Sequence, residues 1–168
     1  YEELGCPESV IGFDIAGDED IVIDHSIADL LKHAKEKFNL GITIHAGETG
    51  NLQNIKDAVN IYSADRIGHG TAAGGSIEVM SLLRERNVCV EVCPISNLLT
   101  NSVPVNMRHP VYQFLEHDVP FVICSDNPGI HRKTLSDDYL TYYLETSDFS
   151  KLNEMLILQK KYSFLFKK

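Results

Sequence analysis

Several features are scarce or missing in this sequence, and each absence excludes a class of function. No apolar run approaches the ~20 residues that a membrane span needs, so a membrane is not an expected partner. Lys and Arg number 15 against 24 Asp and Glu, which leaves a formal net charge of -9 without any basic cluster. Because nucleic-acid affinity rests largely on neutralising phosphates, we expect no nucleic-acid partner.

Paired-cysteine motifs are also missing. The four cysteines show no C-x-x-C spacing, and two of them stand inside apolar, strand-like runs. We therefore expect reduced, buried thiols in a cytoplasmic protein rather than a disulfide framework. A content of 43% hydrophobic and 23% charged residues is that of an ordinary globular chain with one domain-sized core.

What the sequence does contain is an alternation of short apolar runs with amphipathic segments. The apolar runs that predict strands cover residues 9–17, 41–45, 66–70, 87–93 and 120–124. The segments that predict helices cover residues 26–39, 51–61, 76–86, 109–117, 135–144 and 151–166. Continuous apolar strands that alternate with helices are typical of an α/β protein with a parallel sheet.

Polar residues follow the C-terminal tips of successive expected strands. His45 and Glu48 end one strand, His69 ends the next, and Asp126 follows the last. Taken alone, each could be a structural histidine, a loop carboxylate or an ordinary turn residue. Parallel α/β proteins line their ligand crevice with such tips, so the joint placement favours a functional site.

The succession of polar strand tips favours a barrel over a doubly wound sheet. In a (β/α)8 barrel, functional residues come from successive strands around one mouth, whereas in a doubly wound sheet they gather at a switch point. Five strands cannot close an eight-stranded barrel. We therefore expect residues 1–168 to be about five β/α units of a TIM-type (β/α)8 barrel, a fragment that lacks three N-terminal strands.

The chemistry of these side chains is that of metal-assisted hydrolysis. Imidazole and carboxylate are natural ligands for a zinc ion that activates water, and a nearby glutamate can shuttle the proton. The sequence supplies His45 and Asp126 as expected ligands, with His69 near the water. An open zinc site needs about three protein ligands, so this set is short of one or more.

Together these motifs resemble the ordered signatures of the adenosine deaminase family over most of the chain. They are Asp-Ile-Ala-Gly-Asp-Glu at 14–19, His-Ala-Gly-Glu at 45–48, Arg-Ile-Gly-His-Gly at 66–70, Cys-Pro-x-Ser-Asn at 93–97 and Ser-Asp-Asn-Pro at 125–128. The cysteine ligands of the small-fold zinc deaminases, in H-x-E and P-C-x-x-C elements, are absent.

The resemblance implies a role for each site residue. His45 and Asp126 would bind zinc, and the backbone N–H of Gly17 would contact the purine N3. Glu48 would protonate N1 and shuttle a proton as water attacks C6, while His69 would orient and help to activate the zinc-bound hydroxide. Glu48 must then be protonated when substrate is bound, which burial favours. The implied reaction converts adenosine or deoxyadenosine to inosine or deoxyinosine with release of ammonia.

The sequence departs from the family pattern in two places. The family's His-x-His pair of zinc ligands has no counterpart, because the remaining histidines are never two residues apart. This indicates a C-terminal portion of one deaminase barrel that neither binds catalytic zinc tightly nor turns over substrate alone. Asn127 stands where the family usually has a second Asp, and its amide donates toward the purine N7 without needing a proton.

These departures leave alternatives open. An adenine or aminodeoxyfutalosine deaminase, a non-catalytic purine-binding relative, and another metallohydrolase of the same barrel superfamily all remain compatible with the sequence. A half-barrel exposes two strand edges and half of a core. We therefore expect a complementary N-terminal half, or another copy of the chain, to cover those edges.

Overall fold

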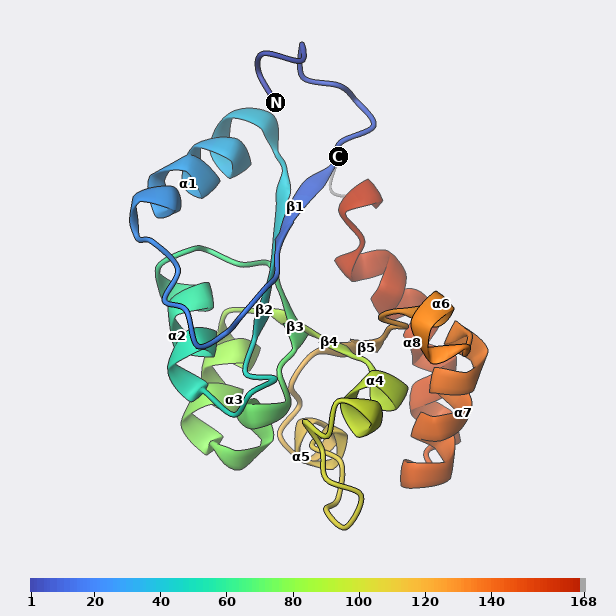
Figure 1. Cartoon of the computed structure of the whole chain (residues 1–168). Coiled ribbons are helices and arrows are strands. Elements are labelled where there is room, and N and C mark those ends of the chain that lie inside the picture. The colour runs from blue at the N-terminus through green and yellow to red at the C-terminus, as the bar shows by residue number, and fades with distance from the viewer. Residues whose placement is uncertain (167–168) are drawn as a thin grey trace.

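The computed structural model describes residues 1–166, and its centre is a sheet of parallel strands (Figure 1). The sheet has five strands in the spatial order β1-β2-β3-β4-β5, which is also their order along the chain. Each neighbouring pair is parallel. The strands are β1 (Gly12–Ile15), β2 (Gly41–Ala46), β3 (Arg66–His69), β4 (Cys89–Val92) and β5 (Phe121–Ile123).

Sequential strand order distinguishes part of a barrel from a doubly wound sheet. A doubly wound sheet reverses its strand order at a switch point, whereas a barrel adds each strand beside the preceding one. Here the helices form an arc around the strands, from α1 through α2, α3 and α5 to α8 (Figure 1). The prediction of about five β/α units with parallel strands, as in part of a (β/α)8 barrel, is confirmed.

The helices match the predicted segments with two additions. They are α1 (Ser26–Phe38), α2 (Leu52–Asn60), α3 (Ile77–Glu85), α4 (Pro94–Leu99), α5 (Val111–Glu116), α6 (Pro128–His131), α7 (Leu135–Thr146) and α8 (Phe149–Tyr162), with 3₁₀ turns η1 (Thr71–Gly75) and η2 (Phe164–Phe166). The short helices α4 and α6 were not predicted. Each begins with a proline, which suits a first helical turn because that position has no intrahelical N–H bond to lose.

The helix expected over residues 151–166 ends earlier than predicted. Ser163 adopts an extended backbone with φ -70° and ψ 131°, which separates α8 from η2. At the start of α8, the Asp148 side chain accepts a hydrogen bond from the Lys151 N–H. This cap satisfies one of the N–H groups that an α-helix leaves unpaired at its beginning.

The main core lies between the convex face of the sheet and the surrounding helices. Ile44, Ile67 and Val90 are almost fully buried on this face. Side chains from α2, α3 and α5 complete the core, among them Ile55, Leu83 and Phe114. Burial of large apolar side chains contributes about 1.5–3 kcal/mol each, so this layer is the principal source of stability.

The opposite, concave face of the sheet is polar. The Arg66 Nε lies 2.6 Å from a Glu91 carboxylate oxygen, and the Thr43 hydroxyl donates to the other oxygen at 3.2 Å. Phe164 of η2 lies over this face, with the Arg66 guanidinium carbon 3.7 Å from its ring centre. The Phe164 ring occupies the space where side chains at Gly12 and Gly41 would project.

Within residues 1–166, no helix combines the length and apolar content that crossing a membrane requires.

Candidate functional site

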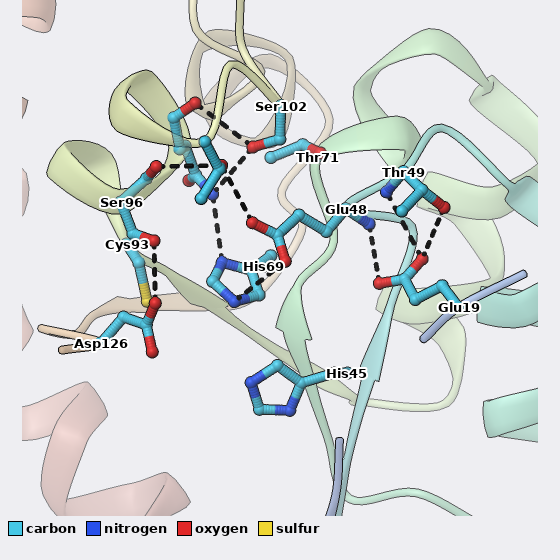
Figure 2. Close-up of polar contacts among 12 residues, drawn as sticks. Glu19, His45, Glu48, Thr49, His69, Thr71, Cys93, Ser96, Ser102 and Asp126 are labelled. Carbon is cyan, nitrogen blue, oxygen red and sulfur yellow. Dashed lines mark hydrogen bonds and ion pairs between the residues drawn. The ribbon is translucent and has the colours of Figure 1, made fainter. Parts of the chain in front are cut away.

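The C-terminal ends of the strands bring the predicted site residues to one edge of the sheet. Figure 2 shows Glu48 beside His69, and it shows His45 and Asp126 extending into the same region from β2 and from the loop after β5. The His45 and His69 rings meet edge to face, with centres 5.1 Å apart. The proximity expected from the strand-tip positions is therefore present in the structure.

His45 is oriented by its neighbours on β1 and β3. Its ring lies across Gly68, where an added Cβ would come within 2.9 Å of the imidazole, so β3 needs a glycine at this point. The His45 Nδ1 lies 3.0 Å from a carboxylate oxygen of Asp14. This hydrogen bond raises the pKa of His45, and the charges of Asp14, Glu91 and Asp126 act in the same direction against the effect of burial.

Glu48 stands on a tight turn that the loop after β1 holds in place. Gly47 has φ 79°, and a Cβ there would also meet Ile55, so only glycine fits this turn. The Glu19 carboxylate accepts hydrogen bonds from the N–H groups of Gly47 at 2.8 Å and Glu48 at 3.0 Å. The Thr100 hydroxyl lies 3.0 Å from a Glu48 carboxylate oxygen.

His69 is buried and held from both sides. It adopts φ 60°, a left-handed conformation that is uncommon for a residue with a side chain and that turns the chain sharply at the end of β3. Its side chain is 4% exposed. The Nε2 lies 3.5 Å from a Glu48 carboxylate oxygen, and the Nδ1 lies 3.1 Å from the Asn97 side-chain nitrogen.

Asp126 is fixed by a donor from α4 and by the next residue in its own loop. The Ser96 hydroxyl donates to one of its oxygens at 2.8 Å, and the Asn127 amide donates to the other at 2.9 Å. The sequence predicted that the Asn127 amide faces a purine. In this structure the amide is engaged with Asp126, so it supports the carboxylate directly.

Gly17 lies in the loop after β1 and lines a hollow of about 340 Å³ together with His45 and Tyr62. No heavy atom lies within 4 Å of where its Cβ would be, so it stands in open space. A second hollow, of about 720 Å³, adjoins Glu48 and is lined by Thr71, Thr100 and Arg108. Both hollows border the cluster formed by His45, Glu48, His69 and Asp126.

The donor set fits part of a metal site. The Nδ1 of His45 is bonded to Asp14, which leaves the Nε2 lone pair for a metal, the arrangement that metal-binding histidines commonly adopt. Asp126 offers a carboxylate that two neighbours orient. In the part of the chain that the structure describes, no three His, Cys, Asp or Glu side chains are grouped closely enough to hold a metal ion.

Some supporting residues had no individual role in the prediction. Asp14, Glu19 and Ser96 belong to recognised motifs, and their positions next to strand tips were the available signal. Thr100 and His109 carried no such signal, because their contacts depend on how α4 and the loop after it fold back over β3.

The comparisons with known proteins agree with the fold and the motifs. The family model described as adenosine deaminase matches residues 4–165. The adenosine deaminase of Clostridium botulinum is 34% identical over 153 residues, which cover 83% of this chain and 46% of that protein. The chain thus spans about half the length of the curated relatives it matches.

Two solved structures share the fold. The adenine deaminase of Arthrobacter aurescens superimposes with a TM-score of 0.82 over 92% of this chain and 47% of its own, at 22% identity. An amidohydrolase from Burkholderia ambifaria with bound zinc gives 0.82 over 96% of this chain and 46% of its own, at 20% identity. The match to the family model over nearly the whole sequence shows that this chain belongs to the adenosine deaminase family.

Proposed function

We propose that this chain forms the C-terminal part of the active site of a zinc-dependent deaminase that acts on a 6-aminopurine nucleoside. The proposed substrate is adenosine or deoxyadenosine. Water replaces the amino group at C6, so adenosine and water yield inosine and ammonia. The observation that carries the proposal is the convergence of His45, Glu48, His69 and Asp126 at one edge of the sheet in a chain of this family.

Glu48 is the proposed acid and proton shuttle. Attack at C6 converts an aromatic carbon to a tetrahedral one, which is easier when the adjacent N1 gains a proton. The Glu48 carboxyl group is on a fixed turn, beside the Thr100 hydroxyl and the His69 ring. A glutamate positioned this way can give a proton to N1 and later pass one to the departing ammonia. His69 is proposed to orient the attacking water.

His45 and Asp126 are the residues of this chain that would hold zinc. When bound, zinc makes water a better nucleophile at neutral pH. The Asp14 carboxylate keeps the His45 ring in place, and Ser96 does the same for the Asp126 carboxylate. We propose that the remaining ligands come from a complementary N-terminal half of the barrel, with residues 1–168 belonging to the same single domain.

The purine would be recognised by the Gly17 backbone N–H at N3 and by Asn127 at N7. For the second contact, the Asn127 amide would have to leave Asp126, to which it donates in the structure. This requirement keeps adenine and aminodeoxyfutalosine as alternative substrates. All four cysteines are free thiols, which supports a cytoplasmic location.

The test uses the chain together with the proposed N-terminal half of the barrel, either as a longer polypeptide or as two chains mixed. We expect zinc in the assembled protein and release of ammonia from adenosine. Glu48→Gln should abolish turnover while purine binding persists, whereas Glu78→Gln, at an exposed position on α3, should leave turnover unchanged. An assembled protein without zinc, or with full activity in Glu48→Gln, would contradict the proposal.

A non-catalytic purine-binding relative is the second candidate. It is favoured by hydrogen bonds that hold the site without a metal, since Asp14 fixes His45 and Ser96 fixes Asp126. In this case the assembled protein would bind purine nucleosides without releasing ammonia, and Glu48→Gln would alter only binding. The same experiment therefore separates the two candidates.

A further inference from the structure

A line of buried polar side chains lies behind His69. It runs from His69 through Asn97 to His109, and these three residues are 3%, 0% and 5% exposed. The His69 Nδ1 lies 3.1 Å from the Asn97 amide nitrogen, and the Asn97 amide oxygen lies 3.3 Å from the His109 Nε2. Because buried polar atoms must find partners, the position of each proton in this line constrains the next.

The line starts at a donor whose proton cannot move. The backbone N–H of Val111 donates to the His109 Nδ1 at 3.1 Å, so this nitrogen must carry a lone pair. Burial lowers the pKa of His109 to about 4, which keeps the ring neutral at neutral pH. A neutral ring without a proton on Nδ1 carries it on Nε2. His109 therefore donates toward Asn97.

The orientation of the Asn97 amide follows from this donor. The His109 Nε2–H needs an acceptor, so the amide oxygen must face His109 and the amide nitrogen must face His69. Ser102 supports the same orientation. Its hydroxyl donates to the main-chain carbonyl oxygen of Asn97 at 3.3 Å, so its oxygen can accept from the Asn97 amide nitrogen, also 3.3 Å away. A flipped amide would place donor against donor at His109.

We propose that the line from Val111 through His109 and Asn97 fixes His69 as the tautomer with its proton on Nε2. The Asn97 amide donates to the His69 Nδ1, so that nitrogen accepts and the proton of the neutral ring sits on the other side. The His69 Nε2–H then points toward the Glu48 carboxylate, 3.5 Å away. Asn97 and His109 are positioning residues that act through His69.

What the tautomer would do in catalysis rests on the proposed function. The assignment of the tautomer itself does not depend on that function. If the site deaminates a purine, neutral His69 offers a hydrogen-bond donor to the reacting groups rather than a lone pair. If the site proves non-catalytic, the same protons still occupy the same nitrogens. A measurement on the imidazole rings therefore tests this proposal separately from the activity.

The direct test is long-range ¹H–¹⁵N NMR on the 168-residue chain with ¹⁵N-labelled histidine at neutral pH. The expected spectrum for His69 has a pyridine-type resonance for Nδ1 and a pyrrole-type resonance for Nε2, and His109 should show the same pattern. A pyrrole-type Nδ1 on His69, or averaged resonances that indicate a tautomer mixture, would overturn the proposal.

Three variants, one at Asn97 and two at His109, test whether the line causes the tautomer. Asn97→Asp replaces the donor with an acceptor, so the His69 Nδ1 should gain a proton and become pyrrole-type. His109→Gln keeps an acceptor for the Val111 N–H and a donor for the Asn97 amide oxygen. The tautomer of His69 should therefore be unchanged. His109→Leu frees the Asn97 amide to turn and should give a tautomer mixture. If the His69 tautomer were unchanged in both Asn97→Asp and His109→Leu, the line of polar side chains would not be the cause of the tautomer. The wild-type spectrum decides the tautomer even if a variant does not fold.

Discussion

Glu19 and Glu48 lie on neighbouring loops, and the side chain of the first holds the backbone of the second. The Glu19 carboxylate accepts hydrogen bonds from the Glu48 N–H at 3.0 Å and from the adjacent Gly47 N–H at 2.8 Å. The Thr49 hydroxyl adds a further bond at 3.2 Å. The turn that carries the proposed acid is thus fixed by the loop after β1 rather than by its own strand.

Glu19→Ala should destabilise the chain by about 1–3 kcal/mol, the range expected when hydrogen bonds to a charged acceptor are removed. The loss arises because the N–H groups of Gly47 and Glu48 no longer have this acceptor. Urea unfolding of the wild type and the variant, followed by circular dichroism, measures the difference.

Asp18→Ala is the matched control for this prediction. Asp18 is exposed, and its side chain accepts a local hydrogen bond from the Asp20 N–H. Its replacement should change the free energy of unfolding much less than Glu19→Ala does. Equal effects of the two substitutions would mean that the bonds to the turn contribute little.

The sequence predicts those residues of the candidate site that stand at the C-terminal ends of strands. His45, His69 and Asp126 each follow an apolar run, and parallel pairing alone brings such positions together. The barrel-like order was also predictable, because it follows from the β/α alternation and from the succession of polar tips. These features depend on local pattern and on general rules of chain connection.

The remaining contacts depend on how loops fold over the strand ends, and no local pattern encodes that. His109 meets Asn97 because the segment after α4 returns to β3, and a lone histidine before a proline gives no sign of it. Phe164 likewise lies over Gly12 and Gly41 at the far end of the sheet. Such contacts join residues far apart in sequence and come from tertiary packing.

Gly41→Ala should destabilise the chain through overpacking. A Cβ at Gly41 would overlap the ring of Phe164, which the Arg66 guanidinium holds from another side. Forcing an extra carbon into a filled site typically costs about 1–3 kcal/mol. Urea unfolding measures the loss, and Gly129→Ala, where no heavy atom lies within 4 Å, should be neutral or slightly stabilising.

The same substitution should be less harmful when Phe164 is smaller. In the Phe164→Ala background the ring is gone, so adding Gly41→Ala should cost less than it does in the wild type. The difference between the two costs is the coupling between the positions. A coupling near zero would mean that Phe164 does not lie over β2 in solution.

Asp14→Asn should lower the pKa of His45. The Asp14 hydrogen bond is the main cause that raises this pKa, and an amide gives a neutral, weaker acceptor. The wild-type pair stabilises the folded chain fully below the pKa of the unfolded state, and this contribution is lost as pH rises through the raised folded pKa. NMR titration of the His45 ring in the metal-free chain measures the shift, with Asp18→Asn as control. An unchanged midpoint would show that Asp14 does not bind His45.

His109 should make the chain lose stability in acid, in the opposite sense to His45. Burial lowers the pKa of His109 to about 4, below its usual value of 6.5. Between these values the unfolded chain binds a proton that the folded chain does not, so acid favours unfolding. The contribution is complete above about pH 6.5 and is lost as pH falls toward 4, a change of roughly 3 kcal/mol at 1.36 kcal/mol per pKa unit. His109→Gln keeps the hydrogen bonds but cannot titrate, so its free energy of unfolding should fall less over this range. Urea unfolding between pH 4.5 and 7.5 compares the two chains, and parallel pH profiles would show that His109 titrates normally in the fold.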